Sequence, residues 1–312
     1  MEVKVMAIKK GTKTAALFQS MKKDTTYVTG RLDKYLADLP ATDVDRAFNV
    51  NAPSAIGNCA RAVFYGRTGV EKDSNFIEPR TRRIFDNGTY VHVRIQEYLS
   101  KEGVLLMDEV PLRNDEFNIQ GHTDGILLLD ENTGELGVLE LKSIKQENFK
   151  DLIDAQEGHK YQGLTYLYCL NERREYLRKK YKTKLQFAAD YKNREKYYWS
   201  LYDHAKDGSK YTRKEKLNFK ADQHNTVDKL LFNSPLPLTK VVFIYENKND
   251  QSLKEFVVDG CLPQHVDVTV SLVEKCDLVN QCVKTGKAPN REGKNKSDIV
   301  CKWCNWRTEC WC

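Results

Sequence analysis

The sequence lacks any apolar run of about 18 residues, so it predicts no transmembrane helix. Its first 23 residues are basic but have no uninterrupted apolar core, which argues against a secretory signal peptide. No internal repeat is found either. We therefore expect a protein of the cytoplasm with no membrane partner.

Without a secretion signal, the nine cysteines favour metal or cluster ligation over a disulfide scaffold. The 312 residues suit one large domain, or a core domain with a sizeable insertion. The net charge of +6 fits a nucleic-acid partner, since Lys and Arg neutralise phosphates. A slightly basic protein with no polyanionic partner would have the same charge, so charge alone leaves both interpretations open.

The hydrophobic pattern predicts a helical N-terminal extension at residues 1–52 and a main domain at 53–312. Predicted helices cover residues 30–39, 55–65, 80–100, 154–178 and 263–285. Predicted strands cover residues 104–112, 117–129, 137–144, 241–246 and 253–258. The sequence DENTG at 130–134 is a strong turn signal between the second and third strands.

Residues 179–238 interrupt this pattern with a basic segment that is rich in Lys and Tyr. Basic residues interleaved with aromatic ones suit the binding of a nucleic-acid strand. A solvated helical insertion explains the same composition equally well. The segment is therefore predicted to be an inserted helical subdomain or an arm.

Two carboxylates and a lysine give the most informative pattern, in GHTDGILL at 121–128 and GVLELKS at 137–143. Because strand periodicity is two, Glu140 and Lys142 share one face of their strand. An antiparallel hairpin folded about Asn132 places Asp124 opposite Glu140, with Cβ atoms about 5 Å apart. A register slip of one residue would turn one carboxylate to the other face.

Two carboxylates this close repel each other, so they either hold a proton or share a cation. A hard divalent ion such as Mg²⁺ or Mn²⁺ suits these ligands. Lys142 could then position an attacking water and offset charge on a phosphate in the transition state. The competing interpretation of the Glu140–Lys142 pair is an exposed ion pair of little energetic value.

The order of these residues resembles the D…(D/E)xK motif of the PD-(D/E)xK nucleases. Gly88–His92 (GTYVH) is similar to the GxxxH element of the RecB-like branch, and Gln162–Tyr166 (QGLTY) is similar to its QxxxY element. The resemblance implies that His92 and the backbone carbonyl of Leu141 bind the metal. It also implies that Gln162 and Tyr166 orient DNA or the lysine. Glutamine and tyrosine four residues apart share one helix face.

The C-terminal sequence CKWCNWRTECWC contains Cys301, Cys304 and Cys310, and Cys59 is the best candidate for a fourth ligand. One early cysteine with a C-terminal C-x2-C-x5-C resembles iron–sulfur nucleases, notably the CRISPR-associated RecB-like exonucleases and the AddB-type group. The resemblance implies a [4Fe–4S] cluster held by four thiolates. A four-cysteine zinc site is the alternative. Cys312 could replace Cys310 as a ligand.

Together these resemblances imply an α/β fold, with a small mixed β-sheet flanked by helices as in restriction endonucleases. The implied activity is Mg²⁺- or Mn²⁺-dependent DNA hydrolysis, most simply by an exonuclease. The sequence YENKNDQSLKEF at 245–256 is similar to a strand pair in phage-encoded members, which implies a host cytoplasm and recombination or phage replication partners. The alternative is a DNA-binding or partner-docking module with little catalysis and a structural zinc or iron–sulfur site.

Overall fold

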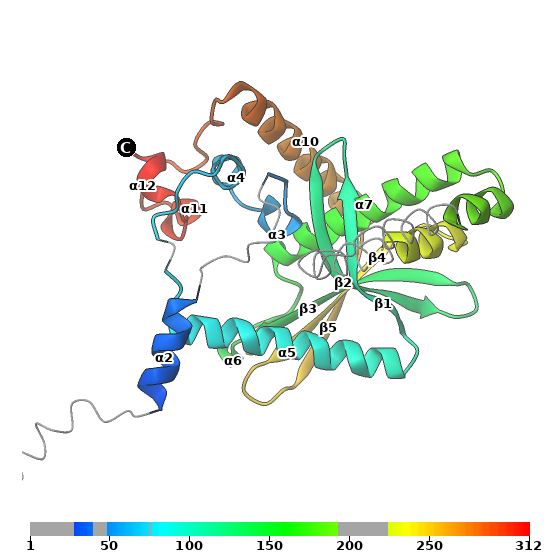
Figure 1. Ribbon diagram of the computed structural model, residues 1–312, viewed down its shortest axis with the longest axis horizontal. Helices are drawn as coiled ribbons and strands as arrows, with labels where there is room; N and C mark the ends of the chain where they lie inside the picture. Colours follow the sequence, from blue (N-terminus) through cyan, green and yellow to red (C-terminus); the bar gives the residue numbers. More distant parts are fainter. Residues whose placement is uncertain (1–27, 40–48, 75, 193–223) are drawn as a thin grey trace, which may run out of the picture. The chain divides into compact units, whose positions relative to one another are not determined.

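The computed structural model describes residues 28–39, 49–74, 76–192 and 224–312 (Figure 1). The chain divides into two compact units. The described part of the first comprises residues 28–39 and 76–86, and that of the second comprises all the others. Parts of the predicted N-terminal extension, residues 1–27 and 40–48, lie outside the described residues.

The first unit contains α2 (Thr29–Asp38) and the beginning of α5 (Pro79–Lys101). Arg82 donates a hydrogen bond of 2.6 Å to the carbonyl of Leu39, and Arg83 forms an exposed ion pair with Asp33. Exposed ion pairs contribute little to stability, so the apolar contacts of the buried Leu36 matter more for this small unit.

The second unit is built on one five-stranded sheet in the order β1-β2-β3-β4-β5. Its strands are β1 (Leu105–Asn114), β2 (Ile119–Asp130), β3 (Glu135–Ile144), β4 (Lys240–Asn247) and β5 (Leu253–Asp259). Only β3 and β4 pair in parallel, and the other neighbours are antiparallel. A parallel pair needs a long crossover, and α7 (Glu157–Lys180) lies in it. The expected α/β class with a mixed sheet flanked by helices is confirmed.

Helices cover both faces of the sheet, as strand periodicity requires (Figure 1). The alternating residues Leu139 and Leu141 pack with Val91 and Ile95 of α5. Residues of the opposite face, such as Val138, belong to the core cluster with α7, and α10 (Pro263–Thr285) packs in turn on α7. Among the described residues, no helix is both long and apolar enough to cross a membrane.

One predicted helix, residues 55–65, is wrong, because the chain forms α3 (Pro53–Ile56) and α4 (Ala60–Thr68) instead. Gly57 keeps helical backbone angles, so the interruption lies between it and Cys59. A Cβ atom on Gly57 would lie 2.9 Å from the ring of Tyr161, so the glycine permits close packing of α7 there. Cys59 has an extended backbone and caps α4 rather than lying within a helix. Three short helices were also not predicted: α6 (Gln146–Lys150), α11 (Ile299–Lys302) and α12 (Arg307–Cys310).

The predicted insertion at 179–238 is described only at its two ends, where residues 184–192 and 224–233 are helical. Phe187 is 6% exposed and stacks on Phe232, with ring centroids 4.4 Å apart. These ends are therefore anchored in the core. Residues 193–223, with most of the basic and aromatic run, lie outside the described residues.

Candidate metal centre

The centre of the site is a strand fork, the point between Asp124 and Gly125 where β2 leaves β3. Along β2, pairing with β1 continues from Ile119 to Leu127, but pairing with β3 begins only at Gly125. The Gly125↔Leu139 pair confirms the register predicted for this end of the hairpin. Nearer the turn, the pairing shifts by one residue between Leu128 and Asp130.

At the strand fork, side chains of β2 form hydrogen bonds to β3 in place of the backbone ladder, which ends there. The backbone N–H of Leu141 donates to Asp124 Oδ2 at 2.5 Å, and Thr123 Oγ1 donates to the carbonyl of Leu139 at 2.7 Å. Gly125 allows the close packing, because a Cβ atom there would lie 2.9 Å from the carbonyl oxygen of Met107. The Asp124 carboxylate is thereby held between the two strands.

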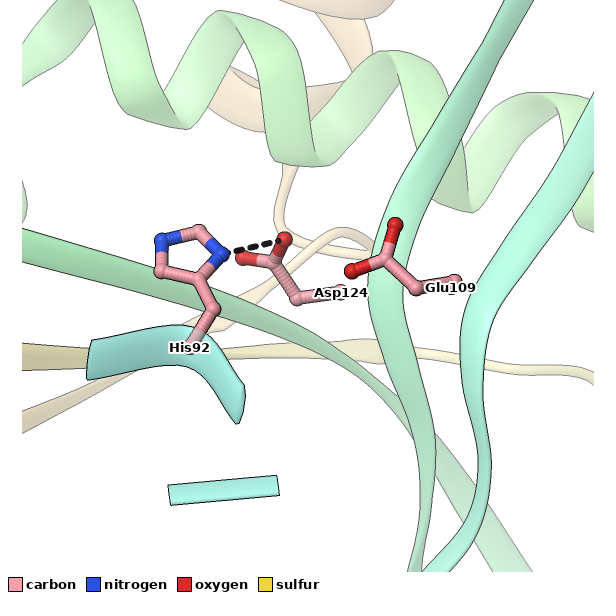
Figure 2. Close-up of side chains that lie close together, drawn as sticks. All are labelled: His92, Glu109 and Asp124. Atoms are coloured by element: carbon pink, nitrogen blue, oxygen red, sulfur yellow. Dashed lines mark ion pairs between the residues drawn. The ribbon is translucent and has the colours of Figure 1, made fainter. Parts of the chain in front are cut away.

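His92 reaches the same carboxylate from α5, with its Nδ1 3.2 Å from Asp124 Oδ1 (Figure 2). Gln96, one turn further along α5, donates to the backbone carbonyl of Asp124 at 2.8 Å and to Glu109 at 3.2 Å. Burial lowers the pKa of His92, but the hydrogen bond and charge of Asp124 raise it above the usual value on balance. A metal ion would have to displace this proton in order to bind.

Glu109 is a residue that the sequence prediction missed. It faces Asp124 across the β1–β2 ladder, between the pairs Asp108↔Gly125 and Val110↔Thr123. One ligand atom from each of His92, Glu109 and Asp124 lies within 4.8 Å of the others, and Figure 2 shows Asp124 between the other two side chains. The φ of Glu109 is +43°, a left-handed conformation that is often found at functional sites.

Glu140 lies on β3 beside this group and is 1% exposed. Its Oε1 forms an ion pair with Lys142, but Oε2 is buried and has no hydrogen-bond partner within the described part of the chain. Burial, followed by the negative charge of Asp124, raises the pKa of Glu140 to about 7, and Lys142 partly offsets the shift. A buried carboxylate oxygen without a partner is costly, so the site favours a proton or a cation here.

The backbone of Leu141 is also oriented toward the strand fork. In a β-strand, the N–H and C=O of one residue point to the same neighbouring strand. Because the N–H of Leu141 donates to Asp124, its carbonyl faces the same side. This orientation is the one that the predicted role as a backbone metal ligand requires.

Lys142 connects these groups to α7. Its Nζ lies 3.4 Å from Gln162 Oε1, and Gln162 Nε2 donates to the hydroxyl of Tyr166 at 2.6 Å. Burial raises the pKa of Tyr166 further above its already high value, so the phenol is neutral. The structure therefore gathers the predicted residues around the strand fork: His92, Asp124, Glu140, Leu141, Lys142, Gln162 and Tyr166.

The second predicted site, the cysteine region, consists of Cys59, Cys301, Cys304 and Cys310. The C-terminal segment packs against α4 and α10 in a cluster that includes Cys310. Burial raises the pKa of the Cys304 thiol, and the nearby thiols of Cys59, Cys310 and Cys301 raise it further. The four cysteines are thus neighbours, although they come from the two ends of the second unit.

The spacing of these thiols bears on what they could bind. Four thiolates around zinc, with Zn–S bonds of about 2.3 Å, would lie roughly 3.8 Å apart. Among the described cysteines, no three sulfur atoms lie within 4.8 Å of one another. Cys301 is packed so closely that a Cβ atom on Gly293 would collide with its sulfur. Cys312 is exposed and donates to the carbonyl of Thr308, whereas Cys310 is buried.

Comparison with known proteins does not assign the chain to a family. No family model matches it, and no curated protein matches it. Among solved structures, it is similar to the crystal structure of SSO0001, with 15% sequence identity and a TM-score of 0.42. The match covers 93% of this chain and 95% of that one. Similarity at this level identifies neither a family nor a function.

Proposed function

We propose that the chain is a Mg²⁺- or Mn²⁺-dependent DNA nuclease of the PD-(D/E)xK type, related to the RecB-like branch and acting as an exonuclease. The observation that carries this proposal is the arrangement at the strand fork. Asp124 lies there with His92 and Glu109, and Glu140 is close enough to feel the charge of Asp124. Within the described residues, Glu140 Oε2 is buried without a partner. The two carboxylates carry more negative charge than Lys142 alone offsets, so the site suits a divalent ion.

The chemistry of the donor atoms fits that ion. Asp124 and Glu140 offer carboxylate oxygens, Leu141 offers a carbonyl oxygen and His92 offers an imidazole nitrogen. Oxygen ligands suit Mg²⁺ and Mn²⁺, and an imidazole is tolerated by Mn²⁺. Glu109 adds a further carboxylate within reach of His92 and Asp124. When bound, the metal would supply a nucleophilic water at neutral pH and offset charge on the leaving oxygen.

The residues on α7 have a positioning role in this proposal. Lys142 is held between Glu140 and Gln162, and Gln162 is itself held by Tyr166. The ammonium group could hold the attacking water or offset charge on the phosphate as the transition state forms. A lysine fixed from two sides loses less entropy during the reaction than a free one.

The proposal for the cysteine region is a [4Fe–4S] cluster bound by Cys59, Cys301, Cys304 and Cys310. The thiols are neighbours, but no three lie as close as zinc would require. A cluster separates its thiolate ligands more widely than a single ion does, because each thiolate binds a different iron. Zinc remains the alternative, and metal analysis of the purified protein distinguishes the two. Iron and sulfide support the cluster, and zinc without iron contradicts it.

A digestion assay tests the proposed activity. End-labelled linear DNA, single- and double-stranded, is incubated with the protein and either Mg²⁺ or Mn²⁺. We expect wild type to degrade the DNA, and Glu140→Gln to be slower by at least about 100-fold, because it removes a ligand. Glu131→Gln, in the exposed turn of the same hairpin, is the matched control and should retain full activity. Equal activity of wild type and Glu140→Gln would exclude this site.

A further inference from the structure

The face of α7 that lines the site begins one turn before the QxxxY element. His159, Gln162 and Tyr166 are spaced by three and four residues, so they lie along one stripe of the helix. Gln162 contacts Lys142, and Tyr166 supports Gln162. His159 has no part in the mechanism described above, yet it is half-buried on the same stripe.

The contacts of His159 fix which of its nitrogens carries the proton. Its Nδ1 lies 2.8 Å from the hydroxyl of Tyr245, and that hydroxyl accepts the backbone N–H of Gln156 at 3.0 Å. Tyr245 is buried, so its phenolic proton needs an acceptor, and within the described residues His159 Nδ1 is the acceptor in reach. A neutral imidazole that accepts at Nδ1 carries its own proton on Nε2.

The position of Tyr245 makes this arrangement rigid and places it beside the site. Tyr245 is 0% exposed, and its ring centroid is 5.6 Å from that of His159. It is the β4 partner of Lys142 in the parallel β3–β4 register. Burial, followed by the positive charge of Lys142, lowers the pKa of His159 to about 4. The imidazole is therefore neutral across the physiological range, where it keeps a single N–H.

That remaining N–H has no partner among the residues that the structure describes. Nδ1 is engaged with Tyr245, and within the described residues Nε2 makes no hydrogen bond. Because the two nitrogens lie on different sides of the ring, Nε2 faces away from Tyr245. A fixed, neutral donor near the charge of Lys142 suits an anionic acceptor, since the lysine draws the anion and the imidazole N–H orients it.

We propose that His159 is a substrate-binding residue, whose Nε2–H donates to a non-bridging oxygen of a DNA phosphate beside the scissile one. This inference rests on the proposed nuclease function and extends it. A neutral imidazole with its other nitrogen already occupied makes a poor proton carrier, so the role is to hold the strand in register. The chemistry that is recognised is a phosphodiester, irrespective of the base.

Three variants test this role through the kinetics of DNA hydrolysis. His159→Phe keeps a ring of similar size and removes the donor, so KM should rise about 10- to 100-fold while kcat changes much less. His159→Gln places an amide donor near the position of Nε2 and should recover most of the loss. Tyr245→Phe leaves the Nε2 donor available but no longer fixed, so its effect should be smaller.

A phosphate-replacement scan locates the contact. Neutral methylphosphonates replace single phosphates of the DNA in turn, and the loss in kcat/KM is measured for each. Wild type should be sensitive at one position where His159→Phe is insensitive. If His159→Phe retains the wild-type KM and the same sensitivity at every position, the inference is overturned while the nuclease proposal stands. If wild type hydrolyses no DNA under any metal condition, both are overturned.

A spectroscopic measurement keeps the test valid if a variant fails to fold. In ¹⁵N-resolved NMR of wild-type protein, His159 should show a protonated Nε2 and an unprotonated Nδ1 throughout the neutral range. The opposite tautomer, or a charged ring at pH 7, would leave no oriented donor and would contradict the proposal.

Discussion

The residues of the strand fork and those of the cysteine region are held in place in different ways. At the strand fork, hydrogen bonds from the backbone and from neighbouring side chains already position Asp124. The cysteine region instead joins Cys59 to a C-terminal segment that contains two helices of four residues each. Helices this short have no stability of their own. The first site is therefore organised without a bound ion, whereas the second would depend on the proposed group that links its thiols.

This difference predicts which part of the fold would need a bound group for its stability. Loss of the ion at the strand fork should stop catalysis and leave the sheet intact. Loss of the group proposed for the cysteine region should loosen the C-terminal segment, because only its packing in the hydrophobic cluster and a small set of hydrogen bonds would then hold it. One of these bonds runs from Trp306 to the carbonyl of Val70, just after α4, at 2.9 Å.

The largest effect is expected for Cys304→Ala, which removes a proposed ligand of the cysteine region. We expect the free energy of unfolding to fall by several kcal/mol, about 3 or more, because binding at a structural site contributes directly to folding. Thermal unfolding with iron and sulfide analysis measures this. Cys261→Ala changes an exposed cysteine outside the region and should have no effect. Unchanged stability and iron content in Cys304→Ala would contradict a structural role.

Asp124→Asn tests the opposite side of the comparison. The amide oxygen can still accept the N–H of Leu141, so the melting temperature should change little. Mn²⁺ affinity, measured by titration calorimetry, should fall by at least about 100-fold. Mutation of a residue that only supports a metal ligand lowers affinity about 10- to 100-fold, and loss of a direct ligand should lower it more. If Asp124→Asn unfolded the protein as Cys304→Ala does, the two sites would not differ as described.

Glu109→Gln sharpens the description of the strand fork. Glu109 belongs to the group with His92 and Asp124, but it also accepts a hydrogen bond from Gln96. We expect Mn²⁺ affinity to fall about 10-fold, less than for Asp124→Asn, as for a residue that orients or supplements a ligand set. Glu131→Gln provides the control in the same titration. An affinity equal to wild type would make Glu109 a structural neighbour only.

The most gradual effect expected is a pH dependence of stability in metal-free protein. Burial raises the pKa of Glu140 from 4.5 to about 7, so between these values the folded state holds a proton that the unfolded state has lost. Stability should therefore fall as the pH rises through this window, by about 1–3 kcal/mol. The raised pKa of His92 adds a slope of the same sign at higher pH.

Denaturant titrations at several pH values, on wild type and Glu140→Gln, measure this dependence. The variant should lack the slope between pH 4.5 and 7 and keep the part that belongs to His92. Added Mn²⁺ should restore stability at the upper end of the window, since the ion binds the deprotonated carboxylate. A wild-type stability that rises through this window would contradict the buried, unpartnered state of Glu140.

Much of the strand fork could be predicted from the sequence because its information is local. The turn at 130–134 sets the register that brings Asp124 toward Glu140, and the alternation around Leu141 sets the faces. Glu109 was within reach of the same reasoning. The polar residues at 114–118 mark the preceding turn, and folding about them brings Glu109 opposite Asp124.

Other features depend on contacts between distant segments, which no local pattern records. The close approach at Gly57 involves Tyr161, more than one hundred residues later in the chain. The tautomer of His159 is set by Tyr245, which a crossover brings beside α7. Periodicity predicts helices and faces well, but it cannot show which buried hydroxyl meets which imidazole.

The most direct test of the central claim is a crystal of the protein grown with Mn²⁺, examined for anomalous scattering. The account predicts a peak at the strand fork, about 2.0–2.3 Å from oxygens of Asp124, Glu140 and the Leu141 carbonyl, with His92 Nδ1 or Nε2 as a further ligand. No peak at this place, or a peak held without Asp124 and Glu140, would contradict it.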